Sequence, residues 1–225
     1  MTSLIAAALF FFLLHLLVSG TPLRAGLVRA MGENTYMGLF SLASLGGIVW
    51  LSMAYGAARG MGTTYWDAGE AGKHTAVAIQ FVAFLFIVIG LATPNPTSVR
   101  QEAALEKADL VRGMLRITRH PFLWGVMIWA VGHLLANGDM PSIVLFGSLL
   151  LLAAFGTVSI DAKRKAAFGL QWEAFAALTS NVPFAAIAAG RQKLVLAEIG
   201  WWRPLVAILV YVAVLYAHPI VFGTN

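Results

Sequence analysis

Long apolar stretches alternate with shorter polar segments along this chain, and the apolar stretches predict its fold. Six of them are long enough to cross the hydrocarbon core of a bilayer as α-helices. They are expected at residues 3–18, 38–55, 75–93, 121–137, 142–159 and 204–222. The pattern therefore predicts an all-α polytopic membrane protein, a helix bundle with about six transmembrane helices.

Composition supports a membrane protein. Only 11% of the residues are charged and the mean hydropathy is +0.81, whereas about 25% of the residues of a soluble domain are charged. The first apolar stretch has no charged segment before it and ends at SGTP, a poor cleavage site. We expect it to be a retained span and not a signal peptide. The chain shows no internal repeat, so we treat residues 1–225 as a single domain, and nothing in the pattern sets an oligomeric state.

The basic residues predict the orientation. Thirteen of the fifteen Lys and Arg residues fall in the first, third and fifth loops, and only Arg59 and Lys73 fall on the other side. The positive-inside rule then places the odd loops in the cytoplasm and both termini outside it, in an expected bacterial inner membrane. Basic loops at a membrane surface contact anionic lipid headgroups, so the high pI indicates membrane lipid as a partner and no nucleic acid.

Residues 161–203, between the fifth and sixth spans, are too many for a simple connector. The segment KRKAAFGLQWEAFAAL mixes basic residues with Phe168, Trp172 and Phe175, which predicts an amphipathic helix at the membrane interface. The following NVPFAAIAAGRQK is too short and interrupted to span. We expect a re-entrant piece or a cap over a cavity.

Two histidines lie inside predicted spans, His15 in the first and His133 in the fourth. An ionisable residue within a membrane helix is costly and marks a functional site by default. Neutral imidazole is a common ligand of haem iron and other metals. The alternative is that each histidine hydrogen-bonds to a neighbouring helix. His74 and His218 lie nearer the ends of their spans, as interfacial residues or as reserve ligands.

Arg116, Arg119 and His120 form a basic cluster where the fourth span begins, and Pro121 takes the first helical position. Guanidinium forks and the positive end of a helix could together hold an anionic group of a cofactor. The alternative is that these side chains extend to lipid phosphates at the membrane surface.

Several kinds of catalytic site are not indicated. The chain has no cysteine, which excludes thiolate ligation of haem and zinc–cysteine sites. It shows no Ser–His–Asp order, no glycine-rich phosphate loop and no HExxH motif. Carboxylates are nearly missing from the predicted spans, so neither a carboxylate proton relay nor a di-iron carboxylate site is expected. Aromatic residues are plentiful, and some could line a pocket for a flat apolar ligand.

The segment GMLRITRHPFLWGVMIWAVGHLLANGD resembles the NnrU family and its relative in plants and cyanobacteria, the 15-cis-zeta-carotene isomerase. HLLVSGTPLR, FGLQWEAFAALTSNVPFAAIAAGRQ and YAHP resemble further segments of that family. The resemblance covers nearly the full chain, and its most specific part is the fourth span.

This resemblance implies a membrane protein that binds haem b through His15 and His133. Reduced haem would then promote cis-to-trans isomerisation of a double bond in an apolar polyene. Two positions differ from the isomerase: Ala130 stands in place of a cysteine, and YGAARG after the second span lacks a histidine. Ligand exchange through those groups is therefore not expected. NnrU proteins are associated instead with denitrification, in the production of active nitrite and nitric oxide reductases.

Two further hypotheses belong to other classes. RHP followed by an FG-x-x-W arm also resembles isoprenylcysteine and phospholipid methyltransferases, which implies an S-adenosylmethionine pocket built from Arg116, Arg119, His120 and Glu173. The other is a membrane assembly factor without a cofactor. A Soret band would favour the haem protein, and a colourless protein that binds S-adenosylmethionine would favour the methyltransferase.

Overall fold

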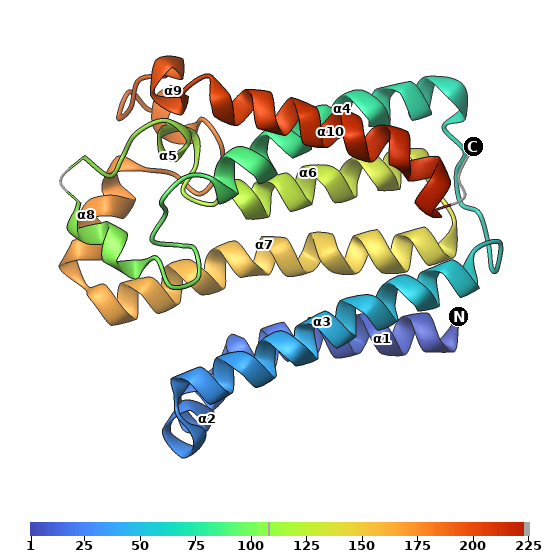
Figure 1. The fold of residues 1–225 in the computed structure, drawn as a ribbon, viewed down its shortest axis with the longest axis horizontal. Helices are drawn as coiled ribbons and strands as arrows, with labels where there is room; N and C mark the ends of the chain where they lie inside the picture. The colour runs from blue at the N-terminus through green and yellow to red at the C-terminus, as the bar shows by residue number, and fades with distance from the viewer. Residues whose placement is uncertain (108, 223–225) are drawn as a thin grey trace. The chain divides into compact units, whose positions relative to one another are not determined.

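The computed structural model describes residues 1–107 and 109–222, and these ranges fold mainly as helices joined by loops (Figure 1). In chain order the elements are α1 (Thr2–Leu13), the π-helix η1 (Leu14–Ser19), α2 (Leu23–Met31), α3 (Glu33–Ala58), α4 (Gly69–Leu91), the 3-10 helix η2 (Glu102–Glu106), α5 (Met114–Ile117), α6 (Pro121–Ala136), α7 (Met140–Phe168), α8 (Leu170–Leu178), α9 (Ala185–Ala188), the 3-10 helix η3 (Leu196–Ile199) and α10 (Trp202–Phe222).

Each of the six predicted spans is helical, which confirms the all-α polytopic fold. Five helical stretches are long and apolar enough to cross a membrane: Thr2–Ser19, Glu33–Ala58, Gly69–Leu91, Met140–Phe168 and Trp202–Val221. The predicted fourth span is the shorter helix α6 of 16 residues. At 1.5 Å per residue it is about 24 Å long, less than the roughly 30 Å of a bilayer core.

The segment after the predicted fifth span is built differently from the prediction. Helix α7 continues through the basic residues to Phe168. It ends at Gly169, where the backbone adopts a φ of +49° and changes direction. Glycine adopts this left-handed conformation at little cost. The prediction of a single amphipathic helix over KRKAAFGLQWEAFAAL is therefore wrong. Trp172 and Phe175 of α8 are buried against Ala104, Leu110 and Leu115, so protein and not the membrane interface covers this aromatic face.

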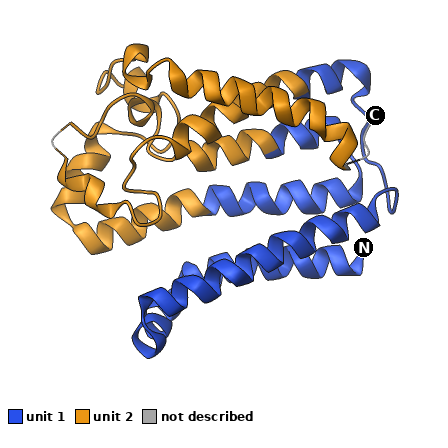
Figure 2. Ribbon diagram, in the orientation of Figure 1, with its two compact units in different colours: residues 1–76, 130–155 blue, residues 77–129, 156–225 orange. Residues whose placement is uncertain are grey.

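The chain divides into two compact units (Figure 2). The first comprises residues 1–76 and 130–155. In it α1 packs along α3, with Leu4 and Leu51 fully buried. The Nε1–H of Trp50 donates to the Ser3 hydroxyl at 3.1 Å, which links α3 to the N-terminal end of α1.

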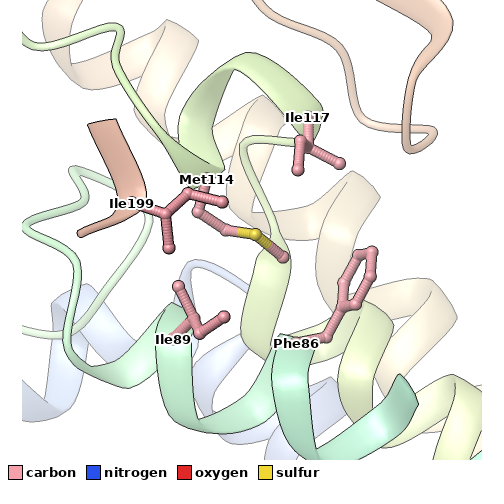
Figure 3. Close-up of a cluster of buried hydrophobic side chains, with 5 residues drawn as sticks. All are labelled: Phe86, Ile89, Met114, Ile117 and Ile199. Carbon is pink, nitrogen blue, oxygen red and sulfur yellow. The ribbon is translucent and has the colours of Figure 1, made fainter. Parts of the chain in front are cut away.

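The second unit comprises residues 77–129 and 156–225. Figure 3 shows one of its apolar clusters, in which Phe86 and Ile89 of α4 meet Met114 and Ile117 of α5 and Ile199 of η3. Helices α4 and α6 approach closely here. A Cβ atom on Gly125 would lie 2.8 Å from the backbone nitrogen of Ile87, so only glycine permits this contact.

The charge asymmetry and the exposed loop positions together give a topology prediction. Glu70, on the side with few basic residues, and Glu106, in the third loop, are both exposed. With single cysteines in this cysteine-free chain, a membrane-impermeant maleimide should label Glu70→Cys from outside intact cells and Glu106→Cys only after the membrane is opened. The reverse pattern would refute the orientation.

Candidate functional site

His15 lies in the π-helix η1, in the first unit. Such π turns occur frequently at functional sites. Its Nδ1 lies 2.9 Å from the carbonyl oxygen of Phe11, and because a carbonyl only accepts, Nδ1 carries the hydrogen. The lone pair of the ring is then on Nε2. The rings of Phe11 and Phe40 flank the imidazole at centroid distances of 4.5 and 5.2 Å. The setting suits a neutral imidazole with one fixed tautomer.

His133 lies near the end of α6, also in the first unit. Its ring stacks on Phe146 of α7, with centroids 4.4 Å apart and an interplanar angle of 20°. Phe146 is buried and meets the ring of Tyr55 edge-on at 5.9 Å. The Tyr55 hydroxyl is 3.1 Å from the hydroxyl of Ser142. Stacking on Phe146 thus orients the ring of His133.

The two imidazoles lie at different levels of the first unit. Phe12, three residues before His15, meets the ring of Phe155 at 6.2 Å. His133 stacks on Phe146, nine residues earlier in α7. At 1.5 Å per residue this offset is about 14 Å along the helix axis. Each ligand of an iron binds it directly through a ring nitrogen, so at this offset the two imidazoles do not meet at one iron in this structure.

The reserve ligands lie elsewhere. His74 is exposed in the first turns of α4, next to the ion pair between Lys73 and Glu70. His218 is near the end of α10, in the second unit. Within residues 1–107 and 109–222, no three His, Asp or Glu side chains gather into a metal-binding group.

The basic cluster before α6 forms a buried polar site in the second unit. Arg119 binds both carboxylate oxygens of Asp161, with its Nε 2.9 Å from Oδ1 and 3.0 Å from Oδ2 and a further contact from Nη2. The Nε2 of His120 is 2.7 Å from the same Oδ1. His120 is only 2% exposed. One carboxylate therefore holds two basic side chains.

The backbone of this turn is held in place as firmly as its side chains. The carbonyl oxygen of Arg119 accepts hydrogen bonds from Asn95 Nδ2 and Thr97 Oγ1, both at 2.9 Å. The amide of Arg119 donates to the carbonyl of Ser180 at 2.9 Å, and the amide of His120 donates to the Thr118 hydroxyl at 3.1 Å. Pro121 has no amide hydrogen, so it leaves no unpaired donor at the first helical position.

His120 is held as a neutral donor. Burial lowers its pKa, and the hydrogen bond and charge of Asp161 oppose that shift. A neutral ring that donates from Nε2 to the carboxylate carries its lone pair on Nδ1. That Nδ1 is buried and has no hydrogen-bond partner, and leaving a buried acceptor unsatisfied is costly.

Arg116 forms a second ion pair. Its Nε and Nη2 bind the two carboxylate oxygens of Glu198 at 2.7 and 2.8 Å, and its Nη1 donates to Gln192 Oε1 at 2.6 Å. The bond from Arg116 and one from the amide of Gly113 lower the pKa of Glu198 to about 2. Gly113 reaches this carboxylate from a φ of +55°. The pair therefore stays charged throughout the physiological pH range.

The sequence predicted that Arg116, Arg119 and His120 form a cluster, but it did not predict the carboxylates that bind them. Asp161 lies inside the long apolar helix α7 and Glu198 in η3, 82 positions along the chain from Arg116. Both guanidinium forks are engaged by these carboxylates, and Glu173 pairs with Lys165 at 3.0 Å. An isolated Asp at the end of an apolar run was the signal that could have revealed Asp161.

Comparison with known proteins now places the chain. The family model described as "NnrU protein" matches residues 3–225. The chain belongs to the NnrU family. This NnrU protein is 32% identical to a protein of Zea mays in a match that covers 74% of the present chain. It is 30% identical to a protein of Arabidopsis thaliana in a match that covers 88% of the present chain. Both relatives are named 15-cis-zeta-carotene isomerase, chloroplastic.

The matches cover 45% and 54% of those two relatives. This NnrU protein thus spans about half the length of the curated relatives it matches. No solved structure matches it.

The Asp161 cluster gives a stability prediction. Asp161→Asn leaves the Arg119 guanidinium, whose side chain is 14% exposed, without a countercharge. Removing one partner of a buried pair costs about 3–5 kcal/mol, and we expect a loss near the lower end of that range in detergent unfolding experiments.

Asp109→Asn is the matched control. It breaks a pair with Arg112 whose side chains are 77% and 58% exposed, which should cost less than about 1 kcal/mol. Equal losses in the two variants would contradict the assigned role of Asp161.

Proposed function

We propose that this protein is a membrane cis–trans isomerase of a carotenoid-type polyene that works with haem b bound through His15 and His133. The proposal rests on membership of the NnrU family and on the names of the two plant relatives. The observation that carries it is the fixed tautomer of His15, which leaves Nε2 as a lone-pair donor within a membrane helix.

His15 fits the group as a single ligand, whereas ligation of the same iron by His133 requires the first unit to rearrange. Haem iron takes neutral imidazole ligands, and a hydrogen bond from the second ring nitrogen to a carbonyl orients such a ligand and raises its basicity. Phe11 supplies that carbonyl to His15. When bound, the haem would supply one-electron chemistry at iron.

The protein's own side chains would orient the ligands and exclude water. Phe11 and Phe40 flank His15, and Phe146 covers one face of His133. Aromatic and aliphatic walls suit a hydrocarbon substrate.

A second candidate is an NnrU-type role in the production of active denitrification reductases, without isomerase activity. The observation that favours it is Ala130, fully buried three residues before His133, where the resemblance to the isomerase calls for a cysteine. A buried methyl group can neither ligate iron nor carry a thiol reaction.

The methyltransferase hypothesis gains no support. It requires Arg116, Arg119, His120 and Glu173 to face a common anionic cofactor. Each of these four side chains has an internal partner of opposite charge or a hydrogen-bonding carboxylate.

The ligand prediction can be read in the visible spectrum. The purified protein should show the Soret band of six-coordinate haem b. His15→Ala and His133→Ala should each remove or shift that band toward the high-spin position, because each deletes one axial ligand. His74→Ala is the control and should leave it unchanged. If the band persists in both variants but disappears in His74→Ala or His218→Ala, the axial ligand is that histidine instead.

The catalytic prediction uses the substrate named in the relatives. Reduced protein incubated with 15-cis-zeta-carotene should convert the 15-cis bond to trans, measured by chromatography, and oxidised protein should not. Absence of conversion by reduced, haem-loaded protein would exclude the isomerase and leave the denitrification role as the better interpretation.

A further inference from the structure

Residues 182–201 of the second unit form a set of loops and short helices, α9 and η3, which we call the foot. Helix α5 holds it in place, and α5 and α9 lie against each other (Figure 1). The amide of Phe184 donates to the carbonyl of Ile117 at 2.8 Å, and the side chain of Arg116 binds that of Glu198. Both ends of the foot are therefore attached to the same short helix.

The foot exposes large apolar side chains on its outer surface. Its inward-facing residues, Ala186 and Ile199, are buried. Five large apolar side chains are exposed instead: Val182, Phe184, Leu194, Leu196 and Trp201. Trp201 is the most exposed of them, at 79%. Loops that face water are normally polar, and apolar side chains gathered on a surface mark an interaction site.

Phe184 is held at the surface against its backbone preference. Its φ is +65°, a left-handed conformation that is unfavourable for a residue with a Cβ atom. The hydrogen bond to Ile117 and one from the amide of Ala188 to the Phe184 carbonyl, both at 2.8 Å, fix this conformation. The phenyl ring is 47% exposed. Strained residues cluster at functional and ligand-contacting positions, and the strain here places an aromatic ring at the outer surface of the foot.

Three apolar helices of the bundle end at the foot. Helix α6 begins at Pro121, four residues after Ile117. Helix α10 begins at Trp202, directly after the foot. The Nε of Arg203 donates to the carbonyl of Ala92 at 3.2 Å, and Ala92 directly follows the last residue of α4. The foot therefore lies at the level where these helices leave the bilayer.

Helix lengths indicate the same level. Helix α6 has 16 residues, so it is about 24 Å long and stops short of the roughly 30 Å of the hydrocarbon core. Asp161 of α7 binds Arg119 just before α6, and it lies about 32 Å along α7 from Met140. The foot is thus at the boundary between hydrocarbon and headgroups, where lipid is available to cover apolar side chains.

We propose that the foot is embedded in one leaflet of the bilayer, the cytoplasmic leaflet in the predicted orientation. The partner of its exposed apolar side chains is then the upper part of the phospholipid acyl chains. Trp201 suits this depth because tryptophan is enriched at the membrane interface. Lys193 is exposed within the foot, and its ammonium group extends to lipid phosphate. The foot adds apolar surface at the level that the short helix α6 does not reach.

Spin labels measure the depth of the foot. In the cysteine-free chain, Phe184→Cys, Leu196→Cys and Trp201→Cys each carry one nitroxide, in full-length protein reconstituted into phosphatidylcholine–phosphatidylglycerol vesicles. Power-saturation EPR compares collisions with O2, which concentrates in hydrocarbon, and with a polar nickel chelate, which hydrocarbon excludes. We expect the ratio of O2 to nickel collisions at all three positions to be at least about threefold higher than at control positions in water.

Leu170→Cys is the matched control. Leu170 is equally apolar and 84% exposed, but it follows the end of α7, about 10 Å beyond Asp161. Glu106→Cys adds a charged and exposed position in η2. Labels at both controls should collide more often with the nickel chelate than with O2.

Each outcome decides the proposal. A high O2 ratio at the three foot positions with a low ratio at Leu170→Cys supports it, whether or not the protein isomerises a polyene. Ratios at the foot equal to those of both controls would overturn it, because the foot would then lie in water. Low collision rates with both reagents would overturn it too, since protein from a second copy or another partner would then cover the foot.

Discussion

The carboxylate of Asp161 is the constraint on which the second unit depends. A buried guanidinium is stable in a low-dielectric interior only with a countercharge and satisfied hydrogen bonds. Asp161 supplies both to Arg119 and also fixes the tautomer of His120. Because these two residues immediately precede Pro121, the same carboxylate determines where α6 begins.

The sequence predicted the spans well because burial in a bilayer requires long apolar helices, whatever their neighbours. It predicted their ends less well. Helix α7 passes through basic residues that the sequence pattern assigned to a separate interfacial helix, since lysine and arginine continue a helix as readily as they end one. Only Gly169, with its positive φ, marks the break. The burial of Trp172 by residues more than fifty positions earlier in the chain depends on tertiary packing, which no local pattern encodes.

The candidate site divides in the same way. His15 and His133 could be named from sequence because an imidazole is conspicuous in an apolar span. The basic cluster could be named too, but its role could not. Arginines that bind an external anion and arginines that bind an internal carboxylate look alike until Glu198 and Asp161 are located. The structure shows that both are engaged within the protein, so the polar cluster acts as a support and the histidines of the first unit remain the candidates for chemistry.

This division also bears on how the family could host different activities. The support before α6 requires a particular set of charges, and a change in any one leaves another buried and unpaired. The first unit is more permissive: its histidines contact aromatic rings, and Ala130 is small, apolar and fully buried. Exchanging alanine for cysteine there adds one soft ligand near His133 with little change in volume. A family built in this way can alter the groups around His133 while keeping the scaffold, because the residues that stabilise the start of α6 are not the residues proposed to bind a cofactor.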